Sequence, residues 1–247
     1  MAGVPAARQV LAILAHLGRS AEPVTAAGLA RALGLPRSTT YHLLGTLAAA
    51  GFVVHLPEER RYGLGLAAYE LGTGYLRQAP LRRLARGPLA GLVDRVGESA
   101  HLAVLHGPDV VYLLEERAPG RPSLVTDVGV RLPAQLTASG RAMLAALPAA
   151  QLRAVFTPPG PDRPGPRTPA ELRALLAAVR RRGYAEEDGE VTPGFSSVAA
   201  AVTDHAGQPV AAVAVTFVAA GVDPDRRAEL AGHAARVAAT VSRRLRG

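Results

Sequence analysis

The chain has 247 residues, of which 49% are hydrophobic, so it is long enough for one or two domains with a real core. It has no cysteine, which excludes disulfides, thiolate metal sites and thiol nucleophiles. The net charge is +8, and residues 1–86 carry ten arginines against four acidic residues, whereas residues 87–247 carry eighteen against sixteen. This excess in the first third indicates a nucleic acid partner, with an ordinary solvated surface as the alternative on charge alone.

Neither a signal peptide nor an apolar run of about 18 residues is found, so we expect a cytoplasmic protein without a membrane partner. The histidines are scattered, without H-E-x-x-H or paired spacing. We therefore expect no metal site and no cofactor.

Apolar spacing predicts three helices at the N-terminus, the first from Ala6 to Leu17. Its packed stripe is expected to consist of Val10, Leu11, Leu14 and Leu17. Thr25 is a candidate N-cap for a second helix that runs from Ala26 to Gly34. Pro36 then opens a third helix, which ends at Ala50. Two short helices joined by a tight turn are typical of a helix-turn-helix.

The third helix has one apolar face and one face of hydrogen-bond donors. The expected inner face consists of Thr40, Leu43, Leu44 and Leu47. The expected solvent face consists of Arg37, Ser38, Thr39, Tyr41 and His42. Such a helix fits the major groove, where arginine binds guanine edges and hydroxyls bind phosphates or bases. A solvated helix face is the alternative if this helix is taken alone.

A hairpin is expected next, with strands at 52–55 and 61–64 and a polar turn between them. This is the wing, and its Arg60 and Arg61 are candidate contacts to phosphate or the minor groove. We include Thr25 with these residues and the solvent face of the third helix as candidate DNA contacts. Gly63 and Gly65 mimic a dinucleotide fingerprint, but no acidic residue ends a following strand, and we interpret them as a hinge.

A helical pattern from Leu66 to Leu76 follows, and Pro80 breaks it, so we place a domain boundary near Ala79. A helix from Leu81 to Val96, kinked at Pro88, opens the second part. Strands are then expected at 100–105, 110–116, near 124–130, at 197–203 and at 210–218. Helices are expected at 139–147, 148–155, 169–182 and 224–245. Strand pairs between helices imply a mostly antiparallel α+β domain.

Several of these segments together resemble the IclR family of bacterial regulators. In the N-terminal part the resemblance rests on residues 29–40, LARALGLPRSTT, and on the wing end RYGLG at 61–65. In the C-terminal part it rests on HLAV at 101–104, VYL at 111–113, RLP at 131–133, TASGRA at 137–142, RGYA at 182–185, Gly194 and VAA at 198–200. The resemblance covers nearly the whole chain.

The resemblance implies three parts: a winged helix-turn-helix (1–65), a linker helix (66–79) and a GAF-like α+β effector-binding domain with an antiparallel sheet (80–247). It implies a transcriptional regulator, possessing repressor or activator activity, that binds a double-stranded DNA operator and a small-molecule effector and forms dimers or tetramers. The sequence departs from the family at three positions. His42 stands where many members carry Arg or Lys, Ser197 where Cys is frequent, and Ala201 where Pro is usual.

The effector is expected to be a small or aromatic carboxylic acid or a related metabolite. Helix N-termini favour anions, so the N–H groups of Ala138, Ser139 and Gly140 are a candidate seat for a carboxylate or carbonyl oxygen. By resemblance, Glu187 stands where relatives place an Asp facing the ligand, and Ser197 and Thr216 add hydroxyls. Without the resemblance, a solvated Glu187 and simple strand alternation would be favoured. His101 is expected to be a satisfied pocket or core residue.

Two other classes of protein were weighed. A hydrolase using Ser139 or the acids between Tyr184 and Gly194 is disfavoured, because no G-x-S-x-G elbow is present and S-x-x-K is impossible without lysine. An architectural DNA-binding protein would not need about 160 further residues of mixed α/β pattern. The sequence therefore predicts a regulator that is not an enzyme.

Overall fold

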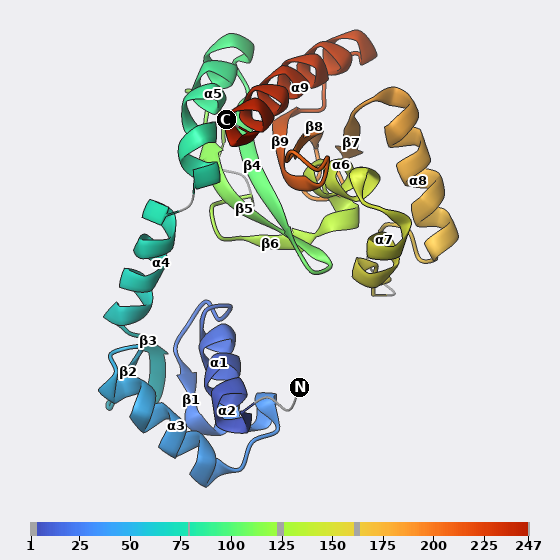
Figure 1. Ribbon diagram of the computed structural model, residues 1–247. Helices are drawn as coiled ribbons and strands as arrows, with labels where there is room; N and C mark the ends of the chain where they lie inside the picture. The colour runs from blue at the N-terminus through green and yellow to red at the C-terminus, as the bar shows by residue number, and fades with distance from the viewer. Residues whose placement is uncertain (1–3, 79, 123–125, 161–163, 247) are drawn as a thin grey trace. The chain divides into compact units, whose positions relative to one another are not determined.

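The computed structural model describes residues 4–78, 80–122, 126–160 and 164–246, with backbone alone at 73–78 and 80. The chain divides into two compact units, Met1–Ala79 and Pro80–Gly247, which are described separately (Figure 1).

The N-terminal unit combines helices with a small antiparallel sheet of order β1-β3-β2. Its elements are α1 (Pro5–Leu17), β1 (Val24–Thr25), α2 (Ala26–Leu33), α3 (Arg37–Ala49), β2 (Val53–Leu56), β3 (Arg61–Leu64) and α4 (Leu66–Gln78). The turn between α2 and α3 follows from local signals. Thr25 caps α2 by accepting from the Gly28 N–H at 3.1 Å, and Gly34 ends it at φ 64°, a left-handed conformation that suits glycine.

The core of this unit contains Ile13, Leu17, Leu29, Leu44, Leu47 and Val53. The expected stripe of α1 was wrong at Leu11, whose side chain is 64% exposed, because the helix turns Ile13 inward instead. Both residues are apolar, and only packing against α2 and α3 decides between them. Strand β1 was not predicted, because two residues carry no period; it pairs Val24 with Tyr62.

Gly65 lies where β3 passes into α4, and its role there is close approach. A Cβ at this position would lie 2.2 Å from the Gly51 carbonyl oxygen. The Gly65 N–H also donates to the Phe52 carbonyl at 2.8 Å. A side chain at this position would therefore push the wing away from the end of α3.

The C-terminal unit is built on a six-stranded antiparallel sheet of order β6-β5-β4-β9-β8-β7. Its strands are β4 (Ser99–His106), β5 (Asp109–Glu116), β6 (Arg131–Pro133), β7 (Ala185–Asp188), β8 (Phe195–Thr203) and β9 (Pro209–Val218). Its helices are α5 (Pro80–Val96), η1 (Ala134–Leu136), α6 (Ala138–Ala146), α7 (Ala149–Val155), α8 (Pro169–Arg182) and α9 (Pro224–Arg246). Helices α5 and α9 cover one face of the sheet, and α6 and α8 cover the other (Figure 1).

The two faces differ in side-chain size, because strand residues alternate between them. Toward α5 and α9, strand β9 presents Val213, Val215 and Phe217. Toward α6 the same strand presents Ala212 and Ala214. The small side chains allow α6 to lie close to the sheet. Helix α6 also lies close to η1 at Gly140, because a Cβ at position 140 would lie only 2.0 Å from the Ala134 carbonyl oxygen.

In this unit one expected strand is wrong and one strand was not anticipated. No strand forms at 126–130, the described part of the expected strand near 124–130; the edge strand is β6 instead. Strand β7 was not predicted, because its sequence, Ala185 to Asp188, contains three acidic residues and lacks β-branched residues. It forms because Ala185 and Glu187 face the core while Glu186 and Asp188 find arginine partners.

Candidate functional site

Helix α3 presents the expected polar face to solvent. Arg37, Ser38, Tyr41 and His42 are exposed and Thr39 is half-buried. On the other side Thr40, Leu44 and Leu47 are buried, whereas Leu43 is only half-buried. The Thr40 hydroxyl donates to the Pro36 carbonyl at 3.0 Å, so this inward polar group is satisfied. No acidic residue lies on α3. Its free face therefore offers donors and one positive charge.

The two wing arginines have different surroundings. Arg60, at the hairpin turn, is exposed and has a left-handed backbone at φ 53°. Arg61 is half-buried, and its guanidinium donates to the Pro23 carbonyl at 2.8 Å and lies 3.8 Å from Glu22. The expected phosphate role thus suits Arg60 better, because Arg61 ties β3 to the segment before α2. Thr25 likewise uses its hydroxyl oxygen to cap α2.

The second candidate site is a cavity between α6 and the sheet of the C-terminal unit. Its volume is about 10 Å³. That is room for about one water. Its lining consists of His101, Tyr112, Thr126, Thr137, Ala138, Ser139, Glu187, Val191, Thr192, Phe195, Ser197, Ala214 and Thr216.

Antiparallel pairing brings three of the candidate ligand residues together. Glu187 on β7 lies opposite Ser197 on β8, and Ser197 lies opposite Thr216 on β9. The Ser197 hydroxyl is 2.8 Å from Glu187 Oε1 and 3.0 Å from Thr216 Oγ1. The three buried groups form one continuous row of hydrogen bonds along the cavity wall.

The N-terminus of α6 lies at the same cavity. Ala138 and Ser139 line it, and the buried Ser139 hydroxyl forms no hydrogen bond of good geometry. The expectation of a free Gly140 N–H was wrong, because this group donates to Thr137 Oγ1 at 2.9 Å. Thr137 is the N-cap of α6, a role that its hydroxyl suggests from the sequence. Ser139 and the first N–H groups remain as the polar end of the cavity.

Burial sets the ionisation of Glu187. Desolvation raises the pKa of this carboxyl from 4.5 to about 7. The hydrogen bond from Ser197 lowers this pKa, the charge of Glu190 raises it, and the Val191 N–H and Arg141 lower it, but burial outweighs them. Near neutral pH the group is therefore poised between a donor and an acceptor form.

His101 lines the cavity, as expected of a pocket residue, although its Nδ1 forms no hydrogen bond within the described part of the chain. The sequence did not point to Tyr112 and Thr126, which also line the cavity. His101 Nε2 is 2.9 Å from Thr126 Oγ1, and burial lowers the pKa of His101 to about 4, so its ring is neutral. The ring of Tyr112 meets that of His101 edge-on at 5.7 Å, and burial raises the Tyr112 pKa. Only strand alternation places these side chains on the α6 face, which is a weak signal in a sequence.

Among the described residues, no three His, Asp or Glu side chains gather as a metal site would require. No helix within the described ranges is long and apolar enough to span a membrane.

Comparisons with known proteins match both units. The family model described as the bacterial transcriptional regulator IclR C-terminal domain matches residues 73–243. The chain belongs to the IclR family. The IclR helix-turn-helix model also matches residues 6–57. The predicted family and fold class are thereby confirmed.

The relatives are named as regulators. The chain is 30% identical over 225 residues to XynR of Escherichia coli, an HTH-type transcriptional regulator, covering 89% of this chain and 88% of XynR. It is 29% identical over 227 residues to the HTH-type transcriptional repressor AllR of Klebsiella pneumoniae, covering 91% and 84%. An IclR regulator structure from Alicyclobacillus acidocaldarius superposes with TM-score 0.82 at 26% identity, covering 98% and 99%. This IclR protein is thus a DNA-binding transcriptional regulator, a class of protein that is not enzymatic.

The buried carboxyl generates a prediction about pH. Because the folded IclR protein holds the Glu187 proton up to about pH 7 and the unfolded chain releases it near 4.5, the stabilising contribution of this group is lost as pH rises through that window. The loss is on the order of 3 kcal/mol at most. Chemical unfolding at pH 5 to 8, followed by circular dichroism, should show Glu187→Gln gaining stability over the wild type as pH rises.

The matched control is Glu186→Gln, on the neighbouring position of β7 with a side chain 33% exposed. Its stability relative to the wild type should not rise across this window. Equal pH profiles for the wild type and Glu187→Gln would show that the carboxyl is not held protonated.

Proposed function

We propose that this regulator reads an operator through α3 and Arg60, and that a small hydroxy or oxo carboxylic acid in the α6 cavity changes its affinity for the operator. The observation that carries the effector proposal is that the buried row Glu187, Ser197 and Thr216 lines one cavity together with the Ser139 hydroxyl, which interacts with Tyr112 alone among the described side chains. Buried polar groups are stabilised by additional hydrogen-bond partners, which a polar ligand would supply there.

The exposed face of α3 supports the operator part of the proposal. An arginine at the start of a recognition helix reaches guanine edges, and neighbouring hydroxyls fix the helix against phosphates. Arg37, Ser38 and Tyr41 provide these groups on one exposed surface. His42 is also exposed, so base preference at that position need not follow relatives with Arg or Lys.

The chemistry of the cavity supports a monoanionic or neutral effector. Its described lining contains no arginine, and the His101 ring is neutral. Stabilisation of an anionic group therefore falls to the N-terminus of α6 and to Ser139. At the opposite wall, Ser197, Thr216 and Glu187 suit a hydroxyl or carbonyl group. A compact molecule with an acid at one end and a hydroxyl or oxo group at the other fits both walls.

Arg37→Ala tests the operator part. Loss of an arginine contact to guanine costs roughly 1 to 3 kcal/mol, so the variant should bind specific DNA several-fold to a hundredfold more weakly. The measurement is a gel shift on an operator that the wild type selects from random-sequence DNA. Arg173→Ala, an equal charge change at an exposed site on α8, is the control and should bind as the wild type does. Undiminished binding by Arg37→Ala would remove α3 as the reader.

We further propose self-association through α4, as a dimer on a partly palindromic operator, with pairing of dimers into tetramers. Leu66, Tyr69 and Leu71 are 70%, 69% and 66% exposed on the isolated chain, which is a large apolar surface for one helix. Tyr75 of the same helix, a second aromatic residue that we include in this surface from the sequence, lies outside the described side chains. Sedimentation should show that Leu66→Ser with Tyr69→Ser weakens assembly, whereas Val128→Ser, at an exposed position of the other unit, does not. A monomeric wild type with intact operator binding would contradict this.

Calorimetry tests the effector site. A thermal-shift screen of small hydroxy, oxo and aromatic carboxylic acids would first find a ligand, because ligand bound to the folded state raises stability. Ser197→Ala and Thr216→Val should then each weaken that ligand roughly tenfold, the effect of about one lost hydrogen bond. Ser196→Ala is the control, because this neighbour on β8 donates to Asp188 and does not line the cavity. If both variants bind as the wild type does, the effector binds elsewhere.

A further inference from the structure

The loop between β7 and β8 forms one wall of the effector cavity. Val191 and Thr192 of this loop line the cavity together with Phe195 at the start of β8. The loop is bounded by Gly189 at φ 76° and Gly194 at φ 81°, backbone conformations that favour glycine. We refer to residues 189–194 as the lid segment.

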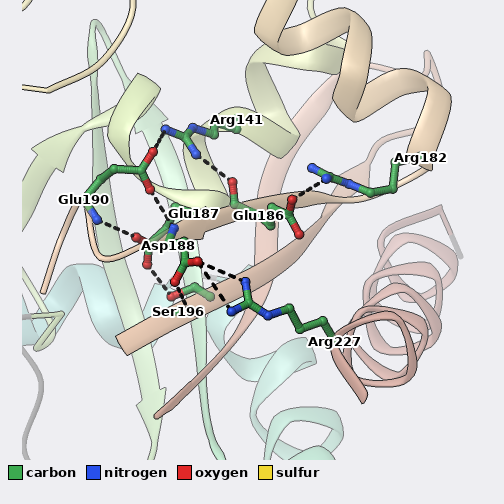
Figure 2. Close-up of polar contacts among 9 residues, drawn as sticks. Arg141, Arg182, Glu186, Glu187, Asp188, Glu190, Ser196 and Arg227 are labelled. Carbon is green, nitrogen blue, oxygen red and sulfur yellow. Dashed lines mark hydrogen bonds and ion pairs between the residues drawn. The ribbon is translucent and has the colours of Figure 1, made fainter. Parts of the chain in front are cut away.

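One ion pair ties the lid segment to α6. Arg141 is 5% exposed, and its Nη2 donates to Glu190 Oε1 at 2.6 Å (Figure 2). The same guanidinium donates from Nε to the Gln135 carbonyl at 2.8 Å and from Nη1 to the Glu186 carbonyl at 2.7 Å. Arg141 therefore links η1, β7 and the lid segment through three charge-assisted hydrogen bonds.

Glu190 passes this contact on to the cavity. Its Oε2 accepts from the Asp188 N–H at 2.6 Å, and its own N–H donates to Glu187 Oε2 at 3.2 Å (Figure 2). The Glu190 carboxylate is thus held between Arg141 and the backbone of β7. The backbone N–H of Glu190 in turn holds the carboxyl of Glu187, which lines the cavity. The position of Glu190 fixes both the lid segment and Glu187.

The neighbouring ion pairs of β7 do not have this property. Arg182 on α8 binds Glu186, and Arg227 on α9 binds Asp188 at 3.3 Å (Figure 2). Both anchor the strand to a helix, and neither acid belongs to the lid segment. They provide a matched comparison for the contact between Arg141 and Glu190.

From this geometry we propose that Arg141 and Glu190 are positioning residues of the effector site, whose ion pair holds the lid segment closed and must open to admit the effector. The proposal rests on the effector site proposed above. The cavity has room for about one water and is too small for a carboxylic acid. The lid segment, which forms one of its walls, therefore has to move before the effector can enter.

Opening removes the Glu190 contacts of Arg141 Nη2 and of Glu187 Oε2, but it leaves the other partners of both residues in place. Arg141 keeps the carbonyls of Gln135 and Glu186, and the side chain of Glu190, already 28% exposed, is hydrated as it leaves. The N–H of Asp188, itself an exposed residue, is likewise open to water. The pair is therefore strong enough to hold the lid segment and is still able to open locally.

The test uses a thiol as a reporter, because the chain has no cysteine of its own. Ser197→Cys and, separately, Ser139→Cys each place one thiol on opposite walls of the cavity. The rate of reaction with a neutral maleimide then measures how often the cavity opens. In both backgrounds Glu190→Ala should raise this rate at least about tenfold, because it removes the hydrogen bonds that the carboxylate accepts from Arg141 and from the Asp188 N–H. Agreement between the two reporters excludes an effect on the acidity of one thiol.

Glu186→Ala is the control. It removes the side chain that Arg182 binds but leaves the carbonyl that Arg141 uses, so the rate should stay within about twofold of the parent. The rise with Glu190→Ala should also be nearly independent of low urea concentrations, because local opening exposes little surface. The proposal would be overturned if the thiol reacted with maleimide only at a rate that rises as steeply with urea as global unfolding does. Equal rates in Glu190→Ala and its parent would also overturn it.

These outcomes are independent of the effector. A faster thiol reaction in a protein that binds no carboxylic acid would leave the closure intact and refute the proposed ligand. Tight effector binding with unchanged thiol rates would refute the closure alone.

Discussion

The architecture of the C-terminal unit depends on how closely α6 approaches the sheet and η1. That approach is possible because position 140 has no side chain and because Ala103, Ala199, Ala212 and Ala214 face the helix. Larger side chains would fill the cavity and push the helix away. The same helix supplies Ser139 to the cavity, Arg141 to the β7 edge and Met143 to the core. The close contact of α6 with the sheet thus brings the polar Ser139, the buried charge of Arg141 and the apolar Met143 to their places on one helix.

Two acids near α6, the half-buried Glu190 and the buried Glu187, are accommodated in different ways. Glu190 has Arg141 within hydrogen-bonding distance and stays within reach of water. Glu187 has only hydroxyl and N–H partners, and desolvation raises its pKa to about 7. A buried carboxylate without a nearby cation has a high free energy, so the carboxyl holds its proton up to near neutral pH. An effector that approaches Glu187 therefore meets a group whose charge responds to its environment.

The two units use polar side chains in opposite ways. On α3 the arginine and several hydroxyls are exposed to solvent. In the cavity the hydroxyls and the carboxyl are already desolvated and bonded to one another. The DNA binding proposed for α3 would therefore depend strongly on salt, whereas the effector binding proposed for the cavity would depend on the geometry of a few hydrogen bonds.

Local chemistry in the sequence was sufficient for much of the fold. Helix α8 is an example, because Thr168 caps it, Pro169 opens it and Gly183 ends it, and its bounds were predicted to the residue. The exposed face of α3 and the hairpin after it also follow from local patterns. The resemblance to the IclR family supplied Glu187, Ser197 and Thr216 as candidates, and their binding of an effector stays a prediction.

Other features were decided by tertiary structure alone. The burial of Ile13 instead of Leu11, the engagement of Arg61 with Pro23, and strand β7 with its three acids carry no local signal. The same holds for the ion pair between Arg141 and Glu190, which are 49 residues apart. Helix caps and turns depend on a few neighbouring residues, so the sequence alone determined them. Burial and charge pairing depend on which distant segments share a strand register, and that register exists only once the sheet has formed.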